Sequence, residues 1–349
     1  MNEAGPRILP EAIGDVRNAR NVMAAAGPGR AVTYFAGPLT PEQRAEIARV
    51  APNVRLLSEL EPNAAVRRAG EADGIDARYA TPEFLAAAKK LVWIQTTGAG
   101  VERYLLSPEI AQNDRIILTN YRGVYGPAIA DHAMAMLLSL TRDLPYCERL
   151  RAERRWRAED SRSRPIALVG RTMLVVGLGG IGLEVARRAQ GFGMRVMGVR
   201  RSSAPSGPGI ERVGLQADLP EMLPQADVVA ICVPLTRQTN RLFDRVALAA
   251  MKPRSYLLNL SRGAVVDTDA LVTALACGVL AGAGLDVVEP EPLPADHPLW
   301  EMPNVVLTPH IAGFSEVTPQ LHWAVTRENL RRFGAGEPML NVVDKQAGY

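Results

Sequence analysis

The amino-acid sequence predicts an α/β protein made of two parallel-sheet domains with a cleft between them. Short apolar segments that suit buried strands alternate with helical segments, which is the pattern of parallel sheets covered by helices. The length of 349 residues is enough for two such domains. An apolar content of 47% and a charged content of 22% are those of a globular protein.

The first series of elements begins at about Ala31, after residues 1–30, which we expect to hold at most one short helix. Its expected strands are 31–36, 54–57, 74–79, 91–96 and 116–119. A helix is expected over 41–50, because Thr40 can cap its N-terminus and Pro41 suits its first turn. A long apolar helix over 127–142 follows this series.

A second series of strands is expected at 173–177, 195–199, 228–232, 256–260, 283–287 and 304–308. The last helix, over 316–333, is placed so that it can return to the first domain. We therefore expect a discontinuous first domain, residues 1–124 with 317–349, and a second domain over 125–316.

The composition argues against several classes of partner. The net charge of +3 is small, and the Arg-rich stretch 149–164 also carries acidic residues, so we expect a solvated helix and no nucleic-acid partner. No apolar run is long enough to span a membrane. The three cysteines lack a C-x-x-C spacing, which favours a reducing, cytoplasmic setting, and no residue spacing indicates a metal site.

A glycine-rich motif, GLGGIG, lies between an expected strand and an expected helix at 181–191. This context is typical of a dinucleotide-binding turn, in which Gly177 allows the turn, Gly179 admits a pyrophosphate and Gly182 lets the helix pack closely. Gly180 and Ile181 open the helix, where amide groups and the helix dipole favour phosphates.

The residues after the next strand indicate which dinucleotide binds. NAD-specific sites place Asp or Glu there, whereas this chain has Arg200, Arg201 and Ser202. Guanidinium and hydroxyl groups suit a 2′-phosphate, so NADP is favoured over NAD. The alternative is that both arginines point into solvent.

Three polar segments, 259–267, 284–294 and 307–315, each follow an expected strand at the edge where α/β sheets bind ligands. They supply Arg262, which can hold a carboxylate, and His310, which can give a proton to a carbonyl oxygen. They also supply Glu291, which can orient that His, with Glu289 as its nearest rival.

The remaining histidines are expected to be structural. His132 lies in the apolar helix and is expected to be a packed core residue. His297, in a proline-rich loop, and His322, in the last helix, are expected to be structural as well.

As a set, VVGLGGIG, CVPLT, NLSRG, GLDVVEPEPLP and TPHIAG resemble the D-isomer-specific 2-hydroxyacid dehydrogenase family over roughly residues 90–340. The resemblance implies two Rossmann-like domains, one flavodoxin-like and one dinucleotide-binding. It implies an oxidoreductase that reduces 2-keto acids to D-2-hydroxy acids with NAD(P)H. The C-terminal tail and the HIAGFS version of the His motif look most like NADP-preferring glyoxylate/hydroxypyruvate reductases.

The resemblance also implies site residues. It places the catalytic roles on Arg262, Glu291 and His310. Further cofactor contacts are implied for Val233, Pro234, Thr239 and Asp286, and substrate contacts for Ala99, Gly100, Val101 and Trp156. Trp156 would lie on an arm that reaches a partner subunit, which implies a homodimer.

Related chemistries remain as alternatives. Formate dehydrogenases pair the His with Gln, so Glu291 argues against them. Phosphite dehydrogenases keep a similar Arg, Glu and His, and co-repressors on this scaffold use the dinucleotide as a sensor ligand. The sequence shows no module that would favour a co-repressor.

Overall fold

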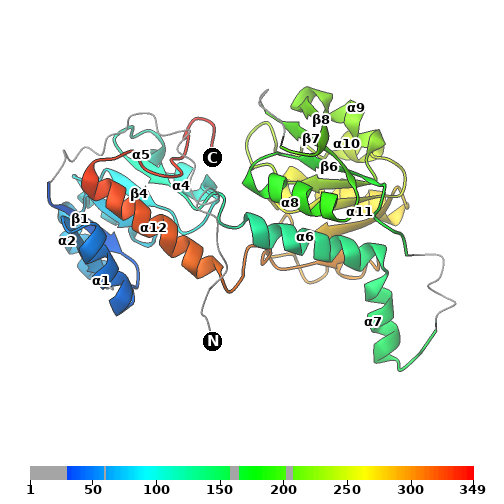
Figure 1. Ribbon diagram of the computed structural model, residues 1–349, viewed down its shortest axis with the longest axis horizontal. Helices are drawn as coiled ribbons and strands as arrows, with labels where there is room; N and C mark the ends of the chain where they lie inside the picture. The colour runs from blue at the N-terminus through cyan, green and yellow to red at the C-terminus, as the bar shows by residue number, and fades with distance from the viewer. Residues whose placement is uncertain (1–29, 59, 158–164, 202–206) are drawn as a thin grey trace. The chain divides into compact units, whose positions relative to one another are not determined.

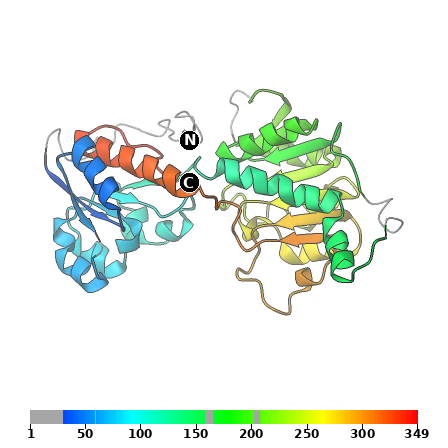
Figure 2. The same cartoon turned by 60° about the horizontal axis from the view of Figure 1, so that its bottom comes forward.

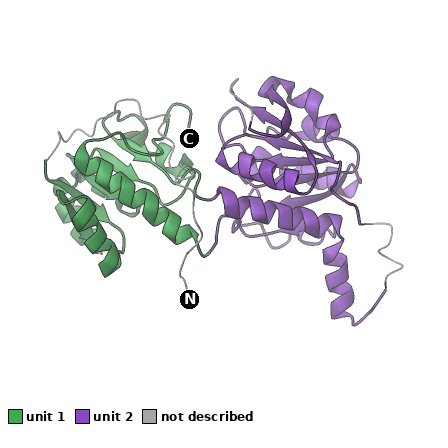
Figure 3. Ribbon diagram, viewed as in Figure 1, with its two compact units in different colours: residues 1–124, 316–349 green, residues 125–315 purple. Residues whose placement is uncertain are grey.

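The computed structural model describes residues 30–58, 60–157, 165–201 and 207–349 (Figure 1), so the expected N-terminal extension lies outside the described residues. The chain divides into two compact units: unit 1, residues 1–124 and 316–349, and unit 2, residues 125–315 (Figure 3). Each unit is an α/β structure with a parallel sheet, and the expected fold class is thereby confirmed. The functional roles expected of the two domains stay predictions.

Unit 1 has a five-stranded sheet in the order β2-β1-β3-β4-β5, which is the flavodoxin-like arrangement. Its strands are β1 (Val32–Ala36), β2 (Val54–Ser58), β3 (Gly74–Asp76), β4 (Trp93–Gln95) and β5 (Ile117–Thr119). Its helices are α1 (Pro41–Val50), α2 (Pro62–Arg68), α3 (Pro82–Ala87), α4 (Glu102–Leu105), α5 (Pro108–Ala111) and α12 (Thr318–Ala335).

Helices cover both faces of this sheet because strand side chains alternate between the faces. On one face, the ring of Trp93 packs against those of Tyr34 and of Phe333 in α12. Phe35 packs with Phe84 of α3 on the other. The expected cap of α1 is confirmed, since the Thr40 hydroxyl accepts a hydrogen bond from the amide of Gln43.

Unit 2 has a seven-stranded sheet in the order β12-β11-β10-β9-β6-β7-β8, the doubly wound arrangement of dinucleotide-binding folds. Its strands are β6 (Thr172–Val176), β7 (Arg195–Arg200), β8 (Ile210–Leu215), β9 (Val228–Ile231), β10 (Ser255–Asn259), β11 (Leu280–Leu285) and β12 (Val305–Leu307). Its helices are α6 (Gly126–Thr141), α7 (Leu144–Ala152), α8 (Gly180–Gly191), α9 (Leu219–Met222), α10 (Arg245–Ala250) and α11 (Thr268–Ala276).

Helices cover both faces of this sheet (Figure 2), and apolar side chains form a separate core on each face. Met173 and Val175 of β6 pack against α6 and α8. Leu174 and Val176 face the opposite side, where α9, α10 and α11 lie. The strand order reverses between β6 and β9, and this fold binds ligands at the carboxyl ends of the strands on either side of such a point.

Two strand predictions were wrong. The sequence pattern did not indicate β8, an edge strand that pairs only with β7 among the described residues and is partly exposed along most of its length. The strand expected over 74–79 ends at Asp76. The Asp76 carboxylate accepts a hydrogen bond from the amide of Arg78, which favours a 3-10 helix over Ala77–Tyr79.

Candidate active site

The glycine-rich turn connects β6 to α8 through backbone positions that only glycine can occupy. Gly177 has a φ of +105°, which L side chains rarely adopt. A Cβ on Gly182 would lie 1.9 Å from the carbonyl oxygen of Gly177, so only glycine lets α8 start this close to the strand. The turn therefore holds the helix N-terminus at the carboxyl end of β6.

This turn leaves room for a phosphate group. A Cβ on Gly179 would meet no atom within 4 Å, and Gly179 and Gly180 are exposed. Ile181 and Gly182 complete the first turn of the 12-residue helix α8, which has no side-chain cap. An exposed helix N-terminus with unfilled space beside it fits the pyrophosphate of a dinucleotide.

The neighbouring strand ends carry the other expected cofactor residues. Arg200 is the last residue of β7, which pairs with β6, and Arg201 follows it and is exposed. Ser202 lies outside the described residues. Beyond β9, the hydroxyl of Thr239 donates to the carbonyl oxygen of Pro234 at 2.6 Å, which closes the loop that begins at Val233.

Arg262 follows β10 in a loop that its own residues hold. The Asn259 side-chain amide donates to the Arg262 carbonyl oxygen at 3.0 Å, and the amide of Ser261 donates to Asn259 Oδ1. The half-buried guanidinium of Arg262 donates to the carbonyl oxygen of Ser261 at 2.7 Å. The backbone that carries this cation is thereby fixed at the end of its strand.

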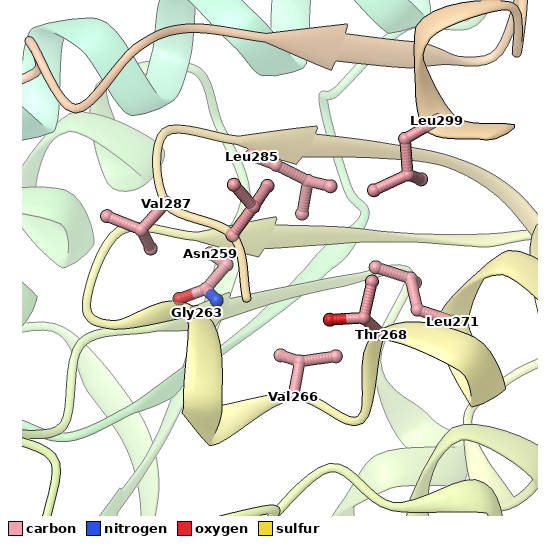
Figure 4. A pocket seen from close by; sticks show the side chains of 9 residues that line it. Asn259, Gly263, Val266, Thr268, Leu271, Leu285, Val287 and Leu299 are labelled. Atoms are coloured by element: carbon pink, nitrogen blue, oxygen red, sulfur yellow. The ribbon is translucent and has the colours of Figure 1, made fainter. Parts of the chain in front are cut away.

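The side of this loop that faces α11 is packed. In Figure 4, Val266, Thr268 and Leu271 lie across from Asn259, Leu285, Val287 and Leu299. The cavity that these residues line has a volume of about 10 Å³. A space of that size holds at most about one water molecule. It is therefore a packing defect behind the loop and no ligand site.

His310 and Glu291 form a pair at the same edge of the sheet. His310 Nδ1 lies 2.8 Å from Glu291 Oε1, and the two side chains are 46% and 42% exposed. Glu289 contributes differently, because its carbonyl oxygen accepts from the hydroxyl of Thr268. Strands β10, β11 and β12 are neighbours, so the loops that carry Arg262, Glu291 and His310 leave adjacent strand ends.

Asp286 organises the loop that carries His310. Its buried carboxylate accepts from the amides of Ile311 and Ala312 at 2.9 and 3.1 Å and from the hydroxyl of Thr308 at 2.7 Å. Its own carbonyl oxygen accepts from the amide of His310. The structure thus shows Asp286 bound to this loop, and its cofactor contact stays a prediction.

The loop over residues 98–101 of unit 1 presents backbone amides. The side-chain amide of Asn120 donates to the Ala99 carbonyl oxygen, and the amide of Tyr104 donates to that of Val101. Within the part of the chain that the structure describes, the backbone amides of Ala99, Gly100 and Val101 donate to no protein group. Such amides suit an anion.

Trp156 lies beyond the end of α7 and is 98% exposed. Figures 1 and 3 show α7 extending away from the rest of unit 2, and Leu150 is the buried residue of this helix. Trp156 therefore exposes a large aromatic surface beyond the end of a projecting helix.

The expectation that His132 is a packed core residue was wrong. Its side chain is 22% exposed, and Nε2 lies 2.9 Å from the hydroxyl oxygen of Thr308. His297 caps a short helix by accepting from the amide of Leu299, and His322 stacks on Tyr121 with ring centroids 4.0 Å apart. The sequence places Thr308 in the TPHIAG motif but did not indicate its contact with His132, because the two residues lie 176 positions apart.

The described residues contain neither a cluster of metal ligands nor a membrane-spanning helix. No group of three or more His, Cys, Asp or Glu side chains there is placed to hold a metal ion. No helix in the same ranges has the length and apolar character that crossing a membrane needs.

Comparison with known proteins places the chain in a family. Residues 134–312 match the NAD binding domain of the D-isomer specific 2-hydroxyacid dehydrogenases. A glyoxylate reductase from Korarchaeum cryptofilum is 37% identical over 78% of this chain and 81% of its own length. The chain belongs to the D-isomer specific 2-hydroxyacid dehydrogenase family. The resemblance inferred from the motifs is thereby confirmed.

Solved structures of other family members have the same fold. A D-isomer specific 2-hydroxyacid dehydrogenase family protein from Aeromonas salmonicida is 35% identical, with a TM-score of 0.77 over 90% of this chain and 99% of that one. An NADPH-dependent glyoxylate/hydroxypyruvate reductase from Sinorhizobium meliloti, in complex with NADP and sulfate, is 28% identical, with a TM-score of 0.75 over 91% of this dehydrogenase and 100% of that chain.

Proposed function

We propose that this dehydrogenase reduces small 2-keto acids of the glyoxylate and hydroxypyruvate type to D-2-hydroxy acids, using NADPH in preference to NADH. The observation that carries the proposal is the 2.8 Å contact between His310 Nδ1 and Glu291 Oε1 at the strand edge that also carries Arg262. The relatives from Korarchaeum cryptofilum and Sinorhizobium meliloti, named as reductases of these acids, support the substrate class.

The proposal gives each of the three side chains a role. Arg262 binds the substrate carboxylate through its guanidinium fork. Glu291 accepts from Nδ1–H of His310, which leaves Nε2–H of the same ring to face the substrate. As the keto carbon is reduced, Nε2 gives its proton to the carbonyl oxygen, and the ring keeps the Nδ1 proton that binds Glu291.

A bound reduced nicotinamide would supply the hydride, and the turn over Gly177–Gly182 would hold its pyrophosphate. Arg200 and Arg201 would bind a 2′-phosphate, which favours NADPH. The contacts of Ser202, Val233, Pro234, Thr239 and Asp286 with the cofactor are part of the same proposal. The amides of Ala99, Gly100 and Val101 would bind a carboxylate of the substrate.

A homodimer is part of the proposal. Trp156, 98% exposed beyond the projecting helix α7, supports an arm that contacts a second copy of the chain. The cytoplasmic setting expected from the cysteines stays a prediction.

The test is oxidation of NADPH and of NADH by the purified protein with glyoxylate, hydroxypyruvate and pyruvate. We expect NADPH-linked turnover that His310→Ala lowers by roughly 100-fold or more, the usual contribution of a general acid, while NADPH still binds. His297→Ala is the matched control, since that ring only caps the amide of Leu299. NADPH binding without turnover in the wild-type protein would contradict a reductase and favour a sensor.

A further inference from the structure

A histidine from outside the three motifs touches the loop that carries His310. His132 projects from α6, and its Nε2 lies 2.9 Å from Thr308 Oγ1 and 3.8 Å from Asp286 Oδ1. The side chain of Asp286 is only 5% exposed. The apolar helix α6 therefore contributes a polar contact to this edge of the sheet.

The direction of these hydrogen bonds follows from the proton count. A threonine hydroxyl has one proton, and that of Thr308 is donated to Asp286 Oδ1 at 2.7 Å. Thr308 Oγ1 must then accept from His132, so the ring carries a proton on Nε2. The result is a chain of donors that runs from His132 to Thr308 to Asp286.

Asp286 accepts hydrogen bonds from residues on both sides of His310 in the sequence. Its carboxylate accepts from Thr308, two residues before His310, and from the amides of Ile311 and Ala312, which follow it. His310 itself has a φ of +55°, a left-handed conformation that costs free energy in a residue with a side chain. Such a backbone persists only where its surroundings determine it.

We propose that His132 is a positioning residue for His310. It fixes the Thr308 hydroxyl, which with Asp286 holds the backbone over 308–312 in the one conformation that places the His310 ring beside Glu291. The inference rests on the proposed function for its kinetic readout. Its structural content, that the His132 donor orders this loop, does not depend on the reaction.

The variants His132→Leu and His132→Gln separate the donor from the shape of the side chain. Leucine fills similar space without a donor, whereas the glutamine amide can donate from about the position of Nε2. Asp131→Asn is the matched control, because Asp131 is the adjacent residue of α6 but pairs with Arg188 of α8.

The kinetic measurement determines kcat and KM separately for each variant, with the keto acid that wild type reduces best. We expect His132→Leu to lower kcat by about 10- to 100-fold, the loss that follows a small misplacement of a catalytic group, with the Kd for NADPH unchanged. His132→Gln should recover most of the loss, and Asp131→Asn should match wild type. If glutamine is as impaired as leucine, or leucine as active as wild type, the inference is wrong.

The second readout is amide hydrogen exchange, followed by mass spectrometry, in peptides that contain Ile311 and Ala312. We expect about tenfold faster exchange in His132→Leu, the effect of losing one hydrogen bond, and wild-type rates in His132→Gln. If wild type reduces no keto acid, the proposed function fails while the exchange rates still decide the inference. Unchanged exchange in His132→Leu would overturn it in either case.

Discussion

Replacement of Gly179 by alanine tests the dinucleotide site without disturbing the fold. Gly179 has a φ of −87° and a ψ of −165°, which alanine adopts without strain, and its Cβ would meet no protein atom within 4 Å. The added methyl group would instead occupy the space proposed for the pyrophosphate. We therefore expect a folded protein that binds NADPH poorly.

The size of the effect follows from the contacts that would be lost. Pushing a phosphate away from the first turn of α8 removes at least one charge-assisted hydrogen bond. Such a bond contributes about 1.5–3 kcal/mol to the free energy of binding. The Kd for NADPH should rise by roughly 10- to 150-fold for a single lost bond. The free energy of unfolding should fall by less than about 1 kcal/mol, since glycine is only a moderate N-cap.

Two other glycines of α8 are matched controls. In Gly182→Ala the Cβ would lie 1.9 Å from the Gly177 carbonyl oxygen, so the helix must shift and both stability and affinity should fall. In Gly191→Ala the Cβ meets nothing within 4 Å, so neither should fall. Titration of NADPH fluorescence gives the Kd, and thermal unfolding without cofactor gives the stability. A wild-type Kd in folded Gly179→Ala would refute the proposed position of the pyrophosphate.

Three further predictions concern cofactor choice, acid stability and assembly. Replacing both Arg200 and Arg201 by alanine should raise the KM for NADPH at least about tenfold and leave the KM for NADH nearly unchanged. If steady-state kinetics shows that the two KM values change by the same factor, neither arginine binds the 2′-phosphate. Burial raises the pKa of Asp227, but hydrogen bonds from Lys252 and from the Thr172 amide outweigh it, so the net pKa is lowered. This stabilisation is fully present above the unfolded pKa of about 3.9 and is lost as the pH falls through the lowered folded pKa, so the stability gap between wild type and Asp227→Asn should narrow as the pH falls below about 4; a gap as large at pH 3 as at neutral pH in denaturant unfolding would contradict this. Trp156→Ala should raise the dimer dissociation constant about tenfold or more, as loss of a buried aromatic anchor does. If the variant and wild type have the same molar mass by light scattering at every dilution, the proposed arm is wrong.

Local signals determined most of the elements. Thr40 and Pro41 marked the start of α1 to the residue, because an N-cap side chain and a fixed proline φ act on their own backbone. The glycines of the turn at 177–182 were recognisable because the close approach of a helix to a strand leaves no other choice of residue. The motif segments after β10, β11 and β12 were predictable as one edge, because parallel strands end on the same side.

Other features needed the neighbours that only the folded chain provides. Among the described residues, the edge strand β8 has one neighbouring strand, and its sequence lacks strong apolar alternation, so pairing with β7 defines it. Asp76 ended a strand by binding the Arg78 amide, which a count of apolar residues does not register. The residues of the expected extension and Ser202 lie outside what the structure describes.

The amino-acid sequence by itself determined the two-sheet architecture, the family and the identity of Arg262, Glu291 and His310 as candidates, because each depends on short-range patterns. Only the tertiary structure decided that Glu291, at 2.8 Å, is the partner of His310, and that His132 is bound to Thr308 rather than packed among apolar side chains. A hydrogen bond depends on tenths of an ångström and on direction, and residues far apart in sequence reach that geometry only after the sheet has aligned their strands.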